Sequence, residues 1–172
     1  GHVISMDPAI GDLPTGDVLI SDGEIVAVAP VVEADGVDVI DATGHIVLPG
    51  LIDTHRHTWQ SLVRGICADW PLGDYYFGIR LGISPAMTPD DVRLGQLVGA
   101  ADALSAGVTT LLDFSHTNNT PDHSDAAVQG LRDAHIRAAH CHGFFESSPA
   151  TSPDNRRSTW SRNCATRPST NA

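Results

Sequence analysis

The stretch LPGLIDTHRH, residues 48–57, carries the most information about the fold of this chain. It completes an apolar run from Ile46 to Asp53 that is typical of a buried strand, and it ends in two histidines one residue apart. Pro49 and Gly50 interrupt the run, and a Pro there suits a strand end or bulge. Because side chains alternate across a strand, Asp53, His55 and His57 are predicted to share one face. Two imidazoles on one rigid element suit a divalent metal. The stretch therefore predicts a metal site and favours metal-assisted hydrolysis.

Downstream, predicted helices and strands alternate. Residues 88–91 read Thr-Pro-Asp-Asp, a typical helix start with a capping Thr, a Pro and two acids in the first turn. The helix should end near Gly107, and its apolar residues recur at helical intervals: Leu94, Leu97, Val98, Ala101 and Leu104. A strand over 108–114, a helix over 124–134 and a strand over 136–143 should follow.

This strand-helix-strand-helix-strand order predicts an α/β fold with parallel strands. It fits either an incomplete β/α barrel or a doubly wound sheet. The turn after the first strand holds histidines and lacks the Gly-rich sequence of a dinucleotide-binding fold. We therefore expect a partial (β/α)8 TIM-type barrel with about three strands present.

The chain upstream of the barrel looks like short strands and tight turns. Residues 17–20 and 24–28 flank an Asp-Gly turn, which predicts a β-hairpin, and residues 37–41 form another candidate strand. We assign residues 1–46 to a small β-sandwich module, too thin to bury a core by itself.

The barrel portion should span residues 47–146, and a tail of different composition follows over 147–172. The tail is rich in Ser, Thr, Asn, Pro and Arg without apolar periodicity, so burial cannot offset the entropy of ordering it. We expect it to be disordered. It is either a natural flexible terminus or a truncated or out-of-frame end, and its abrupt start favours the second explanation.

Composition limits the classes of partner. The formal net charge is −11, which argues against nucleic acid and anionic membranes, and no apolar run is long enough to span a bilayer. The three cysteines are unpatterned, and the first residues lack a secretory signal. We expect a cytoplasmic protein whose partner is neither nucleic acid nor a membrane.

The histidine stretch at residues 48–57, together with the β-module before it, resembles the amidohydrolase superfamily of metal-dependent hydrolases. Residues 55–65, HRHTWQSLVRG, are similar to its deaminase and chlorohydrolase branch, as are AGVTT at 106–110 and the following Asp113. The resemblance covers about residues 1–146. It implies a distorted barrel beside a β-sandwich and one divalent metal, zinc or iron, held by two histidines of the first strand, a later His and a later Asp.

The resemblance carries over to individual positions. His55 and His57 match the first two metal ligands, and Gln60 matches a position that often contacts substrate. Asp53 could orient a ligand imidazole or simply cap the strand end. The remaining ligands and the proton-transferring catalytic residues belong to later strands. We therefore expect an N-terminal fragment that is inactive alone.

Other candidate residues have ordinary explanations. Asp113 is predicted to bond loop amides and Arg64 to pair with an acid. Although His140 and His142 share a strand face, we favour internally bonded histidines over metal ligands, and His116 also lies outside the expected ligand positions. Five aromatic residues could line a heterocycle pocket or simply pack: Trp59, Trp70, Tyr75, Tyr76 and Phe77. In addition, His135 takes the place of a glycine that a helix end would favour.

The resemblance implies hydrolytic deamination of an aminated heterocycle of the purine, cytosine or triazine type. Two alternatives stay open. One is a cyclic-amide hydrolase of the dihydropyrimidinase type, which uses two metals bridged by a modified Lys, whereas this chain contains no Lys. The other is a non-catalytic remnant. The sequence leaves open the substrate, the metal, the leaving group and whether the full-length enzyme is a homo-oligomer.

Overall fold

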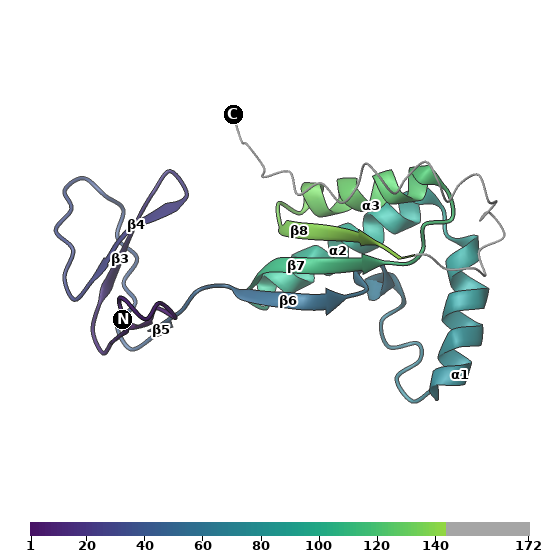
Figure 1. Cartoon of the computed structure of the whole chain (residues 1–172), viewed down its shortest axis with the longest axis horizontal. Coiled ribbons are helices and arrows are strands. Elements are labelled where there is room, and N and C mark those ends of the chain that lie inside the picture. The colour runs from purple at the N-terminus through teal and green to yellow at the C-terminus, as the bar shows by residue number, and fades with distance from the viewer. Residues whose placement is uncertain (144–172) are drawn as a thin grey trace. The chain divides into compact units, whose positions relative to one another are not determined.

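The computed structural model describes residues 1–143, which fall into two compact units (Figure 1). The first comprises residues 1–50, and the second begins at Leu51. The predicted tail at 147–172 lies outside the described residues. The boundary follows Gly50 rather than residue 46, because the strand that begins at Ile46 belongs to the first unit.

The N-terminal unit contains two small sheets. In one, β1 (His2–Ile4) pairs antiparallel with β2 (Asp12–Leu13) and parallel with β5 (Ile46–Val47). In the other, β3 (Asp17–Ser21) and β4 (Glu24–Ala29) form the predicted antiparallel hairpin.

The predicted hairpin is confirmed, and its turn has the backbone conformation that a hairpin needs. Asp22 and Gly23 have φ values of 51° and 79°, and two consecutive positive φ values suit a tight turn between twisted strands. The strand predicted over residues 37–41 is wrong, since these residues lie in no strand. Ile40 in that segment is 92% exposed, so its apolar side chains lack a surface to pack against.

The interruption predicted at Pro49 and Gly50 divides the apolar run from Ile46 to Asp53. The run forms two strands, β5 and β6 (Leu51–Arg56), interrupted over residues 48–50. Pro49 explains the interruption, because it lacks the amide proton that continued pairing requires.

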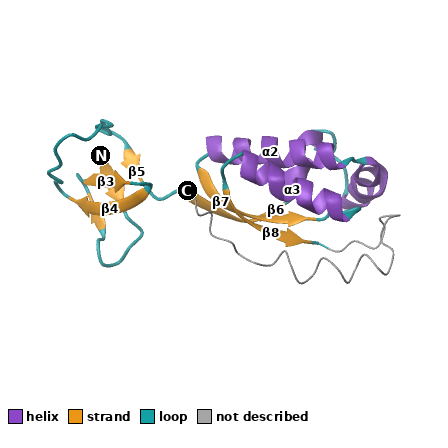
Figure 2. Cartoon of the chain, turned by 90° about the horizontal axis from the view of Figure 1, so that it is seen from above, coloured by secondary structure: helices purple, strands orange, loops and turns teal. Residues whose placement is uncertain are grey.

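The second unit is built on a parallel sheet in which β7 (Val108–Ser115) lies between β6 and β8 (Arg137–His142). The connecting helices α2 (Pro89–Ser105) and α3 (Pro121–Asp133) cover the same face of this sheet (Figure 2). Strands that follow one another in chain order, with their helices on one side, form an arc of a β/α barrel; a doubly wound sheet has helices on both faces. The predicted alternation is confirmed.

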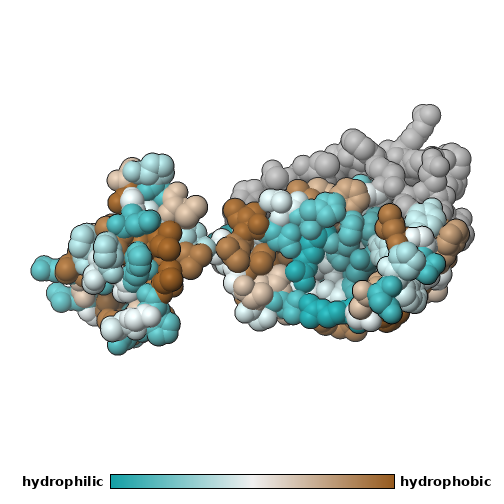
Figure 3. All heavy atoms as spheres, turned by 90° about the horizontal axis from the view of Figure 1, so that it is seen from below, coloured by the Kyte–Doolittle hydropathy of each residue, from teal (hydrophilic) through white to brown (hydrophobic). Residues whose placement is uncertain are grey.

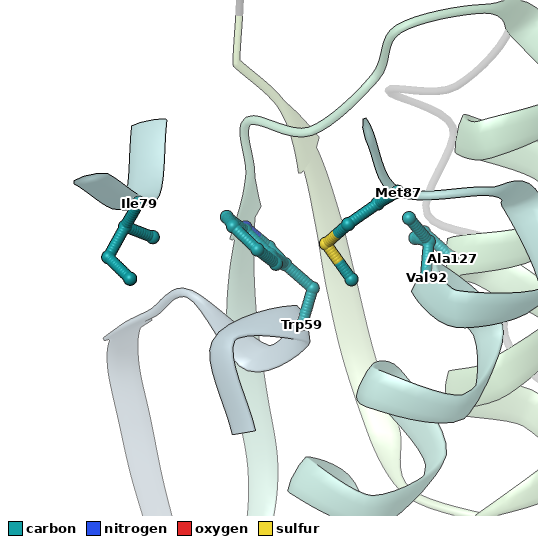
Figure 4. Packing of buried hydrophobic residues seen from close by; sticks show 5 residues of the cluster. All are labelled: Trp59, Ile79, Met87, Val92 and Ala127. Atoms are coloured by element: carbon teal, nitrogen blue, oxygen red, sulfur yellow. The ribbon is translucent and has the colours of Figure 1, made fainter. Parts of the chain in front are cut away.

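The long excursion between β6 and α2 is helical, which sequence patterns did not predict. It contains four short elements: the 3-10 helix η1 (Thr58–Val63), α1 (Leu72–Tyr75), the π-helix η2 (Tyr76–Ile83) and the 3-10 helix η3 (Ser84–Ala86). Trp59 of η1 anchors the excursion, because its indole is fully buried between Ile79 and Met87 (Figure 4). Trp59 is therefore a core residue rather than an exposed pocket wall.

Helix α2 begins as predicted. The Thr88 hydroxyl accepts a hydrogen bond from the Asp91 amide, and the Asp91 carboxylate accepts one from the Thr88 amide. The chain leaves the helix through Gly107, at φ 85°. At the end of α3, His135 has φ 56°, the strained conformation expected where a glycine would be favoured.

The face that α2 buries differs from its apolar series. Leu94 and Val98 are 46% and 43% exposed, whereas Gly95 and Gly99 are buried. A Cβ at Gly99 would lie 2.6 Å from the carbonyl oxygen of Thr58. The small residues of α2 thus permit close approach of η1, which starts directly after the two histidines.

The surface of the second unit is mixed in hydropathy (Figure 3). β6 is an edge strand, and its Leu51 and Ile52 are 53% and 68% exposed. Within residues 1–143, every helix is too short or too polar to cross a membrane.

Candidate metal centre

The two histidines of the HRH stretch converge at the carboxyl end of β6. His55 is the penultimate residue of the strand and His57 immediately precedes η1. Their ring centroids lie 5.0 Å apart in an edge-on arrangement. Each ring centroid is 5.5 Å from that of Phe114 near the carboxyl end of β7. The rings therefore gather on one face, where a shared ligand could reach both.

A main-chain contact sets the tautomer of the neutral His57 ring. Its Nδ1 lies 2.8 Å from the carbonyl oxygen of Phe114. Because a carbonyl oxygen can only accept, Nδ1 carries the proton and the neutral ring keeps its lone pair on Nε2. That tautomer is the one a metal ligand needs at Nε2.

A third histidine lies against this pair. The ring of His116 stacks on His57 with centroids 3.9 Å apart and planes 25° apart. Its Nδ1 accepts a hydrogen bond of 3.0 Å from the indole nitrogen of Trp59. Burial, with smaller contributions from Arg80 and His57, lowers the pKa of His116 to about 3. The stacked ring is therefore neutral near pH 7.

Asp113 supports the same region from the opposite face of β7. Its carboxylate is fully buried and accepts hydrogen bonds from the Thr58 amide at 3.3 Å, from Gln96 Nε2 at 2.9 Å and from His140 Nδ1 at 3.0 Å. Asp113 thus holds the residue that follows His57. These contacts confirm its predicted structural role of bonding loop amides.

His140 and His142 lie on the helix-covered side of the sheet. His140 contacts Asp113 and lies 3.3 Å from the hydroxyl of Ser124 in α3, and His142 Nδ1 is 3.5 Å from that hydroxyl. Burial and, to a smaller extent, His140 lower the pKa of His142. The preference for internally bonded histidines is confirmed. Residues 1–143 contain no group of three His, Cys, Asp or Glu side chains that could hold a metal.

The other candidate residues have protein partners. Asp53 accepts a hydrogen bond of 3.1 Å from the backbone amide of His55, which is the strand-capping alternative. Gln60 donates to the Tyr75 hydroxyl at 2.6 Å. Arg64 forms an ion pair with Asp102, as predicted. The proposed contacts of Gln60 with substrate and of Asp53 with a ligand imidazole stay predictions.

Sequence patterns did not identify Phe114 and His116 as neighbours of the histidine pair. Their position offered a usable signal, because the carboxyl ends of adjacent parallel strands meet at one edge of a sheet. Both residues lie at that end of β7, beside β6.

Comparison with known proteins shows the family of this chain. The model of the amidohydrolase family matches residues 46–168. A 5'-deoxyadenosine deaminase from Methanosarcina barkeri is 32% identical over 145 residues, covering 84% of this chain and 32% of the relative. A 5-methylthioadenosine/S-adenosylhomocysteine deaminase from Symbiobacterium thermophilum is 35% identical over 151 residues, with 84% and 33% covered. The chain thus spans about a third of the length of these relatives.

Solved structures share the fold. An atrazine chlorohydrolase from Arthrobacter aurescens, crystallised with zinc and atraton, aligns with a TM-score of 0.63 at 23% identity and covers 82% of this chain and 34% of that one. A zinc-bound adenosine deaminase from Xanthomonas campestris aligns with a TM-score of 0.61 at 24% identity, covering 80% and 31%. At these identities the similarity concerns the fold alone.

Proposed function

This chain belongs to the amidohydrolase family, and we propose that it forms the N-terminal part of a metal-dependent hydrolase that removes an amino group from a heterocycle. The observation that carries the proposal is the convergence of His55 and His57 at the carboxyl end of β6. In β/α barrels, active sites lie at that end of the strands.

The histidine pair has the chemistry that a zinc site requires. His57 keeps an unprotonated Nε2 because its Nδ1 donates to Phe114, and His55 lies within 5.0 Å of it, measured between ring centroids. A catalytic zinc takes at least three protein ligands, so at least one more must come from outside residues 1–143. When bound, zinc would act as a Lewis acid that makes water nucleophilic near neutral pH.

The substrate class is proposed from the relatives. The two relatives from Methanosarcina barkeri and Symbiobacterium thermophilum are named as deaminases of 5'-deoxyadenosine and of 5-methylthioadenosine. These names support a purine nucleoside with a 6-amino group as the substrate. Such a reaction replaces the amino group by oxygen from water and releases ammonia. Cys67 is a free thiol, which supports a reducing, cytoplasmic location.

The test uses the full-length gene product reconstituted with Zn²⁺. Ammonia release is measured with 5'-deoxyadenosine, adenosine, guanine and a chlorotriazine, and bound zinc is quantified by elemental analysis. We expect release from the adenosine-type substrates, and we expect His57→Ala to reduce bound zinc at least tenfold and to abolish turnover.

His45→Ala is the matched control, because His45 is an exposed histidine of the N-terminal unit. It should change neither zinc content nor turnover. If His57→Ala retained zinc as well as this control does, the proposal would be wrong. Ammonia-free cleavage of a cyclic amide would favour the dihydropyrimidinase-type alternative.

A further inference from the structure

We propose that His116 is a positioning residue that holds the ring of His57 in its metal-binding orientation. This inference rests on the proposed function, since it concerns how the same site is supported. It assigns a role to a histidine that lies outside the ligand positions implied by the family resemblance.

Two contacts at different parts of the ring restrain His57. The imidazole of His116 lies 3.9 Å from it, centroid to centroid, and covers one ring face. The hydrogen bond from Nδ1 to the Phe114 carbonyl holds one ring edge. Rotation of the ring would break the hydrogen bond and disrupt the stack, so together they fix the direction of Nε2.

His116 is itself held from the core at two points. The Trp59 indole donates to its Nδ1, and Trp59 is completely buried. Its main-chain carbonyl oxygen accepts a hydrogen bond of 2.6 Å from Arg80, which is 3% exposed and donates to the hydroxyl of Ser84. Hence the stacking surface offered to His57 is fixed to well-packed residues.

The indole also fixes the tautomer of His116. An indole nitrogen can only donate, so Nδ1 must accept and the proton of the neutral ring lies on Nε2. The two stacked rings therefore have opposite tautomers: His57 carries its proton on Nδ1, and His116 carries its proton on Nε2.

The first test reads both tautomers directly in the purified, metal-free protein. Long-range nitrogen-proton correlation spectra at pH 7.5 should show the Nδ1–H form for His57 and the Nε2–H form for His116. The reverse assignment for either ring would overturn the proposal. This measurement needs no substitution, so it does not depend on whether a variant folds.

The second test measures Zn²⁺ affinity by competition with a chelating dye. His116→Ala should weaken binding about tenfold, as loss of a residue that orients a ligand does. His116→Phe keeps a ring for stacking and should retain most of the zinc affinity that His116→Ala loses. His45→Ala should have no effect.

These variants separate the two proposals. If His57→Ala does not weaken zinc binding, the metal site itself is wrong. If His57→Ala weakens binding while His116→Ala behaves like His45→Ala, the metal site stands and the positioning role is overturned. Circular dichroism confirms that the variants compared are folded.

Discussion

Two His-x-His pairs lie toward the ends of two strands of one sheet, yet they have different surroundings. His55 lies in β6 and His57 directly follows it, and both rings gather around the ring of Phe114. His140 and His142 end β8 and contact buried polar groups between the sheet and α3. The sequence spacing is identical, so the spacing cannot be what makes one pair a candidate metal site.

The face of the sheet makes the difference. Consecutive strand residues point to opposite sides, so Asp113 and Phe114 of β7 face the helices and the opposite side respectively. On the helix side, the carboxylate of Asp113 bonds a ring nitrogen of His140. On the other side, His57 bonds Phe114 through Nδ1, and among residues 1–143 its Nε2 stays available for a ligand. A histidine pair is a metal candidate where the fold leaves its nitrogens available.

The largest expected effect comes from the residue that supports both pairs. Asp113→Ala would leave the Thr58 amide, Gln96 and His140 without their buried acceptor. We expect the free energy of unfolding to fall by about 3 kcal/mol, because buried unpaired donors are costly. Urea denaturation measures the loss, with exposed Asp35→Ala as the control. Equal stability of the two variants would mean that Asp113 does not support the pairs.

A smaller effect should reach only the β6 pair. Gly99→Ala would place a Cβ 2.6 Å from the carbonyl oxygen of Thr58, the residue after His57. We expect a loss of about 2 kcal/mol from overpacking and a weaker zinc affinity. The matched control is Gly73→Ala, where a Cβ would meet nothing within 4 Å. Unchanged zinc affinity in Gly99→Ala would show that η1 does not set the position of His57.

The smallest effect is the contribution of His142, in the β8 pair, to the pH dependence of stability. Burial lowers the folded-state pKa of His142, so below about pH 6.5 the unfolded chain binds more protons than the folded one. Stability should therefore decrease as the pH falls from 7 to 5, by less than about 1 kcal/mol for this half-buried group. In metal-free protein, His142→Asn should make the dependence shallower, and the part that remains comes from the lowered pKa of His116. The exposed control His2→Asn should leave the dependence unchanged. Parallel curves for all three proteins would contradict the assignment.

Much of the second unit could be predicted from local sequence. The Thr88 cap, the end of α2 at Gly107 and the strand over 108–114 were confirmed because each depends on neighbouring residues. The strand predicted over residues 37–41 was wrong because an apolar run alone does not determine which sheet, if any, it will join. The apolar series of α2 also failed to identify the buried face of the helix, because close packing required glycines on that face.

The sequence by itself determined that two imidazoles would end the first barrel strand and that helices would connect parallel strands, since alternation and capping are short-range effects. Only the tertiary structure decided which histidine pair keeps its nitrogens available and which ring stacks on His57. These outcomes depend on neighbours distant in the chain: Phe114 and His116 lie beside β6 only because β7 pairs with it. Local sequence thus places the histidines at the end of a strand, and long-range strand pairing determines which of their nitrogens can bind a ligand.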